Sequence, residues 1–202
     1  MIKTIIADDH PIFLKGFELM LSYTKKYKII ATASDGVELK DIATKFKADL
    51  ILVDYRMPLL NGIEVVALLK KKSNSKIVLV TSFIDEWIVE QAKEIGVEGI
   101  ICKSSEESDI IDNLDKIMKG EKIFPSNKEI YNRIYEPLKS KYNLTQNETN
   151  TIKDINNGMG IKEIAAKNFV SVDTVKSRKK TAFEKLKISK TSLLAKILKQ
   201  FN

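Results

Sequence analysis

Residues 49–58 read DLILVDYRMP, and this stretch constrains the fold more than any other part of the chain. Residues 50–53 form an apolar, partly β-branched run, which is typical of a strand buried on both faces of a parallel sheet. Asp54 ends the run, and Pro58 prevents its continuation because proline has no N–H to donate to a neighbouring strand. Open α/β sheets bind their ligands at the carboxyl ends of the strands, so Asp54 is a candidate functional carboxylate.

Four further apolar runs alternate with helical patterns along the first part of the chain. Strands that alternate with helices in this way indicate a doubly wound, five-stranded parallel α/β sheet, which we assign to residues 1–122. The other predicted strands are residues 2–7, 29–33, 77–80 and 99–102. The helices are expected to start near Pro11, after Gly36, after Gly62, near Trp87 and after Lys103.

Polar residues follow four of the predicted strands, at the point where each strand ends. They are Asp8 and Asp9, Asp54, Thr81, and Lys103. Because the carboxyl ends of parallel strands meet at one edge of a sheet, we expect these side chains to converge. Each aspartate alone could simply be a turn residue, but four strand ends that supply mutually useful groups favour a functional site.

A cluster of acids with a hydroxyl and a lysine is suited to phosphoryl transfer. Asp9 and Asp54 can ligate Mg²⁺ directly while Asp8 holds a bound water, because magnesium takes a few oxygen ligands and keeps several waters. Asp54 can then attack a phosphoryl group as a carboxylate nucleophile and form an acyl phosphate. Lys103 offers a positive charge, and Thr81 a hydroxyl donor, to the phosphoryl oxygens.

Three other residues near this cluster are expected to be structural. His10 is the only histidine of the chain, and we favour a local structural role for it over a ligand or catalytic role beside the acids. Cys102 is expected to be a small core residue, since free cysteine packs as a small hydrophobe. Phe83 is expected to pack close to Asp54.

Charge is unevenly distributed along the chain. Residues 1–122 carry 18 Lys and Arg against 20 Asp and Glu, whereas residues 123–202 carry 16 against 7. This asymmetry indicates two domains, of which the second faces a polyanion. A solvated lysine-rich surface would have the same composition, so charge alone leaves both interpretations open.

Composition also indicates the cellular compartment of the protein. The single cysteine, Cys102, cannot form an internal disulfide, which favours a reducing cytosol. No apolar run approaches the roughly 20 residues needed to span a bilayer, and the first residues lack the order of a signal peptide. We therefore expect a cytoplasmic protein without a membrane partner.

Residues 123–143 lose helical periodicity and contain two prolines. We predict a linker here, with a broken helix over 129–135. The remainder, residues 144–202, is helical throughout and opens on a capping box at Thr145 and Glu148. Its helices are predicted at residues 145–157, 162–168, 171–186 and 189–201.

The third of these helices carries its cations on one face. Lys176, Ser177 and Lys180 share that face, because residues three and four positions apart are neighbours on a helix. A cationic helix suits the major groove of DNA, where lysine reaches guanine acceptors and neighbouring cations hold phosphates. A solvated lysine-rich helix is the alternative that the charges leave open. The flanking residues are Thr174, Arg178 and Lys179.

Several motifs of the first domain resemble the receiver domain of bacterial two-component response regulators, of the NarL/FixJ type. The resemblance implies a flavodoxin-like receiver in which Asp54 accepts a phosphoryl group from a sensor histidine kinase. It also implies that Mg²⁺ is bound by Asp9, Asp54 and the backbone carbonyl of Arg56. The motifs are DDHP at 8–11, ILVDYRMP at 51–58, NG at 61–62, TSF at 81–83 and GIICK at 99–103.

Residues 144–202 resemble a LuxR-type helix-turn-helix domain, with KEIA at 162–165 and TVK at 174–176 in the motif positions. By this likeness, Lys176, Ser177 and Lys180 would approach base edges. Arg178 stands where the motif usually has histidine. Similar domains also use the last helix to dimerise on DNA, which suits paired half-sites.

Together these features predict a response regulator transcription factor. A sensor kinase would phosphorylate Asp54 and thereby control homodimerisation and the binding of promoter DNA. The protein would modify itself once per phosphoryl donor and would not be a turnover enzyme.

Two other functions compete with this one. A Mg²⁺-dependent phosphohydrolase with an aspartyl nucleophile would need a second acid two residues later, where Arg56 stands. A phosphorylation-independent DNA-binding regulator would use its receiver only for dimerisation. Ile100 gives weight to this second alternative, because it occupies the position of the family's usual Tyr or Phe.

Overall fold

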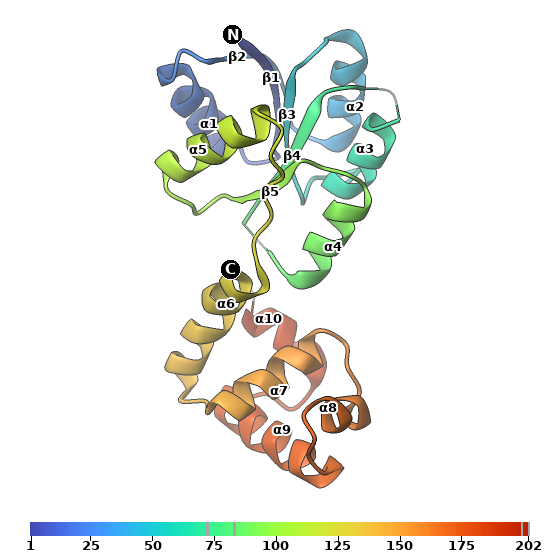
Figure 1. Ribbon diagram of the computed structural model, residues 1–202, viewed down its shortest axis with the longest axis vertical. Helices are drawn as coiled ribbons and strands as arrows, with labels where there is room; N and C mark the ends of the chain where they lie inside the picture. Colours follow the sequence, from blue (N-terminus) through green and yellow to red (C-terminus); the bar gives the residue numbers. More distant parts are fainter. Residues whose placement is uncertain (72, 83, 199, 202) are drawn as a thin grey trace. The chain divides into compact units, whose positions relative to one another are not determined.

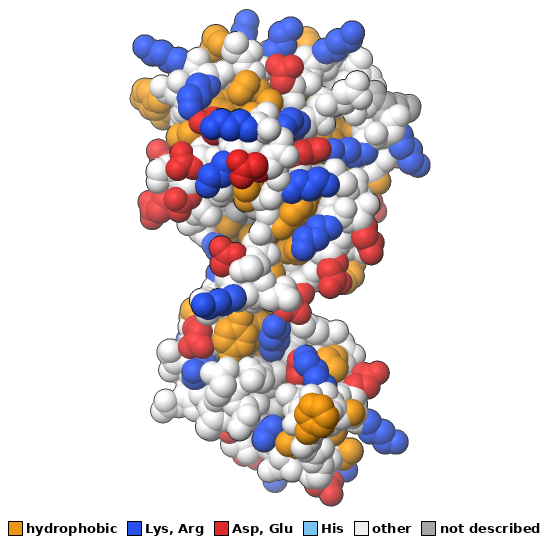
Figure 2. Space-filling view, in the orientation of Figure 1, with side chains coloured by type: hydrophobic (Ala, Val, Ile, Leu, Met, Phe, Trp, Pro, Cys, Tyr) orange, Lys and Arg blue, Asp and Glu red, His pale blue; other side chains and the backbone are white. Residues whose placement is uncertain are grey.

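A computed structural model describes residues 1–71, 73–82, 84–198 and 200–201 of the chain. The chain forms two compact units (Figure 1). The first consists of residues 1–84 and 88–125, and the second of residues 126–202 together with 85–87. Charged side chains of both signs cover the visible face of each unit (Figure 2). Among the described residues, no helix has the length and apolar character that crossing a membrane requires.

The first unit is built on a five-stranded sheet whose neighbouring strands all run parallel. The predicted fold class is therefore confirmed. The strand order is β2-β1-β3-β4-β5, so the chain extends the sheet to one side of β1 and then to the other. The carboxyl ends of β1 and β3 flank this change of direction, which is where doubly wound sheets bind ligands. The strands are β1 Ile2–Ala7, β2 Tyr27–Ala33, β3 Leu50–Asp54, β4 Lys76–Thr81 and β5 Gly99–Cys102.

Helices cover both faces of this sheet, with α1 and α5 on one face and α2, α3 and α4 on the other (Figure 1). Polar residues define where two of them begin. The Asp35 carboxylate accepts hydrogen bonds from the backbone of Val37 and Glu38, and Asn61 forms a capping box with Glu64. The helices are α1 Pro11–Tyr23, α2 Gly36–Lys45, α3 Gly62–Leu69, α4 Glu86–Glu94 and α5 Glu107–Met118.

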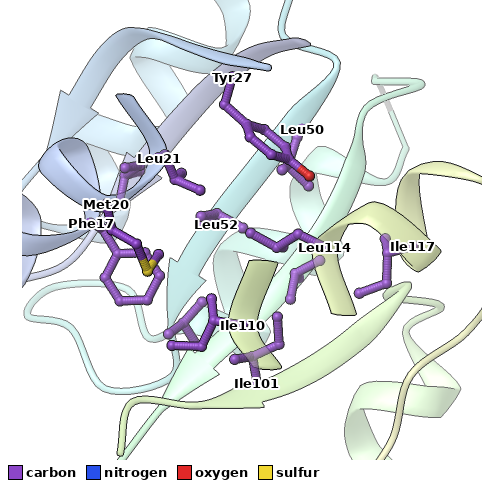
Figure 3. Close-up of a cluster of buried hydrophobic side chains, with 13 residues drawn as sticks. Phe17, Met20, Leu21, Tyr27, Leu50, Leu52, Ile101, Ile110, Leu114 and Ile117 are labelled. Carbon is purple, nitrogen blue, oxygen red and sulfur yellow. The ribbon is translucent and has the colours of Figure 1, made fainter. Parts of the chain in front are cut away.

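The core between α1, α5 and the sheet is centred on β3 (Figure 3). Leu50 and Leu52 of β3 point into this layer, and all five residues of the strand are buried. Because side chains alternate along a strand, Ile51 and Val53 face the opposite layer. The apolar run 50–53 is thus buried on both faces, as its composition predicts. The helical residues of the cluster are Phe17, Met20 and Leu21 of α1 and Ile110, Leu114 and Ile117 of α5.

In the part of the second unit that the structure describes, the regular elements are all helices. The predicted capping box is present, since Thr145 accepts from the backbone of Glu148 and the Glu148 carboxylate accepts from that of Thr145. The last helix is shorter than the predicted 189–201, because the segment opens as a short 3-10 turn and α10 ends at Leu198. The elements are α6 Asn127–Tyr142, α7 Gln146–Asn156, α8 Ile161–Lys167, α9 Val172–Leu186, η1 Thr191–Leu193 and α10 Leu194–Leu198.

The segment predicted as a linker, residues 123–143, is different in the structure. Ile123 forms a parallel bridge with Gly99 beside β5, and α6 then runs unbroken through Pro137. A proline inside a helix removes one hydrogen bond and costs about 3 kcal/mol. Burial of Tyr135 and Leu138 on either side of it offsets that cost. The prediction placed a break because of the proline. In the structure, the helix follows the spacing of its apolar residues and continues through Pro137.

Candidate functional site

The carboxylates predicted to converge do lie together at one edge of the sheet. Asp8 follows β1 and Asp54 ends β3, and the pairing of Ala7 with Val53 places the two aspartates next to each other. Asp8, Asp9, His10 and Asp54 each offer one ligand atom, and these atoms all lie within 4.8 Å of one another. Asp8 and Asp54 are each 4% exposed, whereas Asp9 is open to solvent. The cluster therefore has a buried floor and an accessible side.

Lys103 lies directly against the two buried carboxylates. Its Nζ is 2.5 Å from Asp8 Oδ2 and 3.0 Å from Asp54 Oδ2, and its side chain is only 3% exposed. The same Nζ lies 4.6 Å from the centroid of the Phe13 ring, an additional cation–π contact. The Lys103 backbone N–H donates to Thr81 O at 2.9 Å, which fixes the start of this loop. One buried cation is thus shared by two carboxylates.

This sharing leaves Asp54 in an unusual electrostatic state. Burial raises the pKa of the Asp54 carboxyl, and the neighbouring Asp8 raises it further. Lys103 and the Arg56 N–H, which both favour the charged form, lower the pKa but do not cancel these effects. Among the described residues, Asp8 and Asp54 share one buried cation, so the pocket carries an excess of negative charge when both acids are ionised.

His10 connects the two aspartates of the first strand end. Its Nδ1 lies 3.1 Å from Asp8 Oδ1 and 2.8 Å from Asp9 Oδ1, and its backbone N–H donates to Asp8 Oδ1 at 2.9 Å. Pro11 follows as the first residue of α1, where proline is well suited. Sequence reasoning assigned His10 a local structural role, and these bonds describe one: His10 orders both acids at the start of the helix.

Glycines hold the loop after β3 close to the site. A Cβ added at Gly62 would lie 2.4 Å from the backbone oxygen of Asp54, and one added at Gly36 would lie 2.2 Å from that of Leu60. The Gly62 N–H donates to Tyr55 O at 2.9 Å, which closes the loop on itself. Any larger residue at either position would push the loop away. Arg56, whose carbonyl was predicted to bind the metal, lies in this loop.

Thr81, the fourth predicted group, ends β4 and is 1% exposed. The register pairs Asp54 with Val80, so Thr81 is one residue beyond Asp54 on the adjacent strand. Cys102 is buried, as predicted, and its Sγ lies 3.4 Å from Ser104 Oγ. Phe83 lies outside the described residues.

The second candidate site is the outer face of α9. Val175, Ala182 and Leu186 are buried on the inner side of this helix, which turns Lys176, Ser177 and Lys180 outward. Lys176 is 64% exposed and lies 3.2 Å from the even more exposed Asp173, so this ion pair is weak. Half-buried residues flank the face: Thr174, Arg178 and Lys179.

Two buried carboxylates of α7 position α8 and α9. Sequence reasoning found Glu148 only as a capping residue and did not find Asp154. Glu148 Oε2 on α7 lies 2.7 Å from Lys185 Nζ of α9. Asp154, also on α7, lies 2.6 Å from Lys167 Nζ of α8 and accepts from Asn168 at 3.3 Å. The turn between α8 and α9 places Phe169 in the left-handed region, with φ 52°. Helical spacing gives only a partial signal: it places Glu148 on the face of α7 that also carries Ile152 and Ile155, but it does not identify Lys185 as its partner.

Comparison with known proteins defines the class. The response regulator receiver domain family matches residues 4–115, more than half of the chain, so the chain belongs to the response regulators. The oxygen regulatory protein NreC of Staphylococcus aureus is 31% identical over 217 residues, which cover 98% of this chain and 97% of NreC. The transcriptional regulatory protein YdfI of Bacillus subtilis is 28% identical over 191 residues, which cover 92% of this chain and 90% of YdfI.

Solved structures extend the likeness to both units. RcsB from Salmonella enterica serovar Typhimurium, bound to promoter rprA in the presence of phosphomimetic BeF3−, superposes with a TM-score of 0.59 at 25% identity over 98% of each chain. The receiver domain of NarL from Mycobacterium tuberculosis superposes with a TM-score of 0.57 at 27% identity. The match covers 59% of this chain and 98% of the NarL receiver. The protein is thus a NarL-type response regulator transcription factor, with a receiver domain and a LuxR-type helix-turn-helix domain. Its receiver provides for regulation by phosphorylation.

Proposed function

We propose that Asp54 accepts a phosphoryl group from a sensor histidine kinase, and that this modification controls homodimerisation and promoter binding. The observation that carries the proposal is the contact of Lys103 Nζ with both Asp8 and Asp54 in a buried pocket. An Asp54 carboxylate oxygen attacks the phosphorus of the phosphohistidine, the P–N bond breaks, and the imidazole leaves with its electron pair and takes up a proton. Lys103 and the Thr81 hydroxyl, at adjacent strand ends, then hold the transferred phosphoryl oxygens.

The donor set of the pocket fits Mg²⁺. Carboxylate and carbonyl oxygens are the ligands that this ion prefers, and Asp8 and Asp54 share a single buried cation, Lys103, among the described residues. Asp9, Asp54 and the Arg56 carbonyl would hold the ion directly, and Asp8 would hold one of its waters. When bound, Mg²⁺ reduces the repulsion between the carboxylates and the incoming phosphoryl oxygens.

The kinase docks on α1. This helix starts immediately after the acid cluster, so a protein that delivers a phosphoryl group to Asp54 must pass close to it. Ile12, Leu19 and Tyr23 are 87%, 56% and 76% exposed, and they form one stripe along the helix with Gly16 between them. A contiguous exposed apolar surface of this kind marks a protein interaction site.

The α9 face binds DNA, and the active form is a homodimer. Lys176, Ser177 and Lys180 point away from the domain core, as a helix that enters the major groove requires. The relative RcsB has been solved as two dimers bound to two parallel DNAs, which supports the same assembly here. Paired half-sites on the promoter would match a two-fold protein dimer.

Substitution of the acceptor tests the phosphorylation step. We expect D54N to abolish Mg²⁺-dependent labelling by acetyl phosphate, because an amide is not a nucleophile of this kind. The control is D112N, which removes an exposed carboxylate of α5 and is expected to label like the wild type. Labelling can be measured by phosphate-affinity electrophoresis and by intact mass. Full labelling of D54N would remove Asp54 as the acceptor.

A second substitution tests the docking surface separately from the chemistry. L19E places a charge in the exposed α1 stripe and is expected to slow phosphotransfer from phosphorylated sensor kinases of the same cell about tenfold, a loss of roughly 1.4 kcal/mol. Labelling by acetyl phosphate, which needs no docking, is expected to be unchanged. If L19E were labelled more slowly by both donors to the same extent, the substitution would have damaged the pocket. If L19E were labelled at the wild-type rate by both donors, the α1 stripe would be excluded as the kinase-docking surface.

A second function is favoured by one observation, the identity of residue 100. Ile100 is buried on β5 and its N–H donates to Ile123 O, so an aliphatic side chain fills the position expected to hold an aromatic switch. A receiver used only for dimerisation would show the same oligomeric state and DNA affinity with and without beryllofluoride. A shift in either measurement, absent in D54N, would exclude this alternative.

A further inference from the structure

A cavity of about 840 Å³ lies at the edge of the receiver sheet opposite Asp54. It is formed by the last turns of α2 and α3 and by the loops that enter β3 and β4. The phosphorylation pocket lies at the other ends of these same two strands. The described function gives this cavity no role, and its volume falls within the range of about 300–1,000 Å³ that is typical of small-molecule sites.

Large apolar side chains that line the cavity are exposed to solvent. Phe46, which follows α2, and Leu68, in the last turn of α3, line it and are 47% and 42% exposed. Ala43, Leu69 and Met118 contribute further apolar lining. Most of the other lining residues are polar or charged, so the cavity combines an apolar surface with polar groups, as an amphiphilic ligand requires.

The rim of the cavity is positively charged. Of the described residues that line it, four are lysines and one is an acid, Asp49, whose Oδ2 already accepts from the Lys3 N–H at 2.8 Å. Among the residues that the structure describes, neither Lys47 nor Lys71 forms an ion pair or a side-chain hydrogen bond. The lysines of the rim are Lys40, Lys47, Lys71 and Lys76.

The other two lysines of the rim have partners. Lys40 Nζ lies 3.9 Å from Asp41 Oδ1, and Lys76 Nζ donates to Ile117 O and Met118 O at the end of α5. Lys47 and Lys71 are therefore the cations available to a ligand. Their clustering is not a consequence of composition, because residues 1–122 carry more acids than bases.

We propose that this cavity binds an amphiphilic organic anion, a fatty carboxylate, with its chain along Phe46 and Leu68 and its carboxylate between Lys47 and Lys71. The apolar lining selects the hydrocarbon chain, and Lys47 and Lys71 select the negative headgroup. The site is independent of phosphoryl transfer, since none of its lining residues belongs to the pocket around Asp54.

Decanoate, used below its micellar concentration, is the probe for this proposal. Titration into the full-length ¹⁵N-labelled protein is expected to give saturable amide shifts at residues 43–49 and 68–71, and not at Asp8 or Asp54. Decyltrimethylammonium, with the same chain and the opposite charge, is expected to bind at least about tenfold more weakly. Equal binding of both amphiphiles, or shifts only outside these residues, would overturn the proposal.

Charge reversal provides the matched comparison. The double variant K47E/K71E is expected to weaken decanoate binding at least about tenfold by calorimetry. The control K28E/K122E changes the net charge equally at two exposed positions that do not line the cavity, and is expected to bind like the wild type. Both variants should retain labelling by acetyl phosphate, which verifies that the receiver is folded.

An acidic peptide is the competing ligand for such a surface. An amphipathic peptide rich in glutamate that binds at residues 43–49 and 68–71 while decanoate does not would overturn the assigned ligand class. Equal decanoate affinity in K47E/K71E and in K28E/K122E would overturn the assigned headgroup site.

Discussion

Buried carboxylates meet lysines in both domains, but the two sites have opposite electrostatic character. In the receiver, Asp8 and Asp54 share Lys103, and the pKa of Asp54 is raised because burial and the second acid outweigh that one cation. In the helix-turn-helix domain, burial alone would raise the pKa of Glu148. Bonds from Lys185 and from the Thr145 N–H and hydroxyl outweigh burial there and lower the pKa.

This difference separates a binding site from a structural support. Glu148 is satisfied within the folded chain: Lys185 Nζ lies 2.7 Å away and the Thr145 N–H donates at 2.7 Å. In the receiver pocket, two buried acids share one buried cation, Lys103, although the backbone N–H groups of His10 and Arg56 also donate to them. A buried acid with an excess of negative neighbours favours a ligand cation, whereas one with an excess of donors stabilises the fold.

The largest expected effect is stabilisation of the receiver alone by Mg²⁺. A ligand at one hundred times its Kd stabilises the folded state by about 2.7 kcal/mol, and we expect this gain to appear in the receiver. The helix-turn-helix domain contains no such excess of acids around a buried cation among its described residues, so its unfolding transition is expected to be unchanged. Calorimetry with and without Mg²⁺ measures both transitions.

D9N is the matched variant for this measurement. It removes one proposed metal ligand at an exposed position and leaves the buried Asp8–Lys103–Asp54 contacts in place. The receiver transition of D9N is expected to lose most of its response to Mg²⁺. A full response in D9N, or an equal shift of both transitions in the wild type, would show that the ion acts elsewhere.

The next effect in size comes from removing the charge of each buried acid in turn. E148Q leaves Lys185 without its carboxylate and is expected to destabilise the helix-turn-helix domain by about 1–3 kcal/mol. D54N removes one of two like charges that share a cation, and is expected to stabilise the receiver at neutral pH. Urea unfolding of the two variants compares them directly. Destabilisation of similar size in both would show that the two sites are equally structural.

The pH dependence of E148Q sharpens the same comparison. The folded-state pKa of Glu148 is lowered, so its ionised form contributes stability above the ordinary value of 4.5. That contribution is lost as the pH falls from 4.5 through the folded-state pKa. The wild type is therefore expected to lose more stability than E148Q in this acid range, and the two should converge at its lower end. A difference that is independent of pH would contradict the role of charge.

Sequence reasoning located the receiver site because its geometry follows from strand ends. The run at 50–53 specifies a doubly buried strand, and a parallel sheet brings Asp8, Asp54 and Lys103 to one edge whatever the loops between them do. These three residues could therefore be predicted without coordinates. The chemistry assigned to them remains a proposal that D54N tests.

Contacts that depend on packing between elements were not predictable in this way. No sequence spacing relates Phe13 to Lys103, Gly36 to Leu60, or Glu148 to Lys185, because each pair meets only after separate elements have packed. Helix α6 was mispredicted for a related reason. Pro137 signals a break locally, and the burial of its neighbours, which outweighs that signal, depends on the rest of the domain.

The smallest expected effect on stability comes from removing lysines that face solvent, because these lysines contact no buried acid. Lys103 is 3% exposed and is held by two carboxylates, whereas Lys176 is 64% exposed and Lys180 is also exposed. K176A and K180A are therefore expected to leave stability within about 0.5 kcal/mol of the wild type. Each is expected to weaken promoter binding by about 1 kcal/mol or more, through the loss of a base or phosphate contact.

Salt dependence distinguishes the two kinds of DNA contact. Loss of a phosphate contact reduces the slope of log K against log salt by about 0.9, whereas loss of a base contact relaxes sequence preference and leaves the slope nearly unchanged. K128A, at an exposed position early in α6, is the control and is expected to bind like the wild type. If K176A and K180A also bound promoter DNA like K128A at moderate salt, the outward face of α9 would not be the DNA-binding surface. Lys176 and Lys180 would then be solvated charges without a specific role.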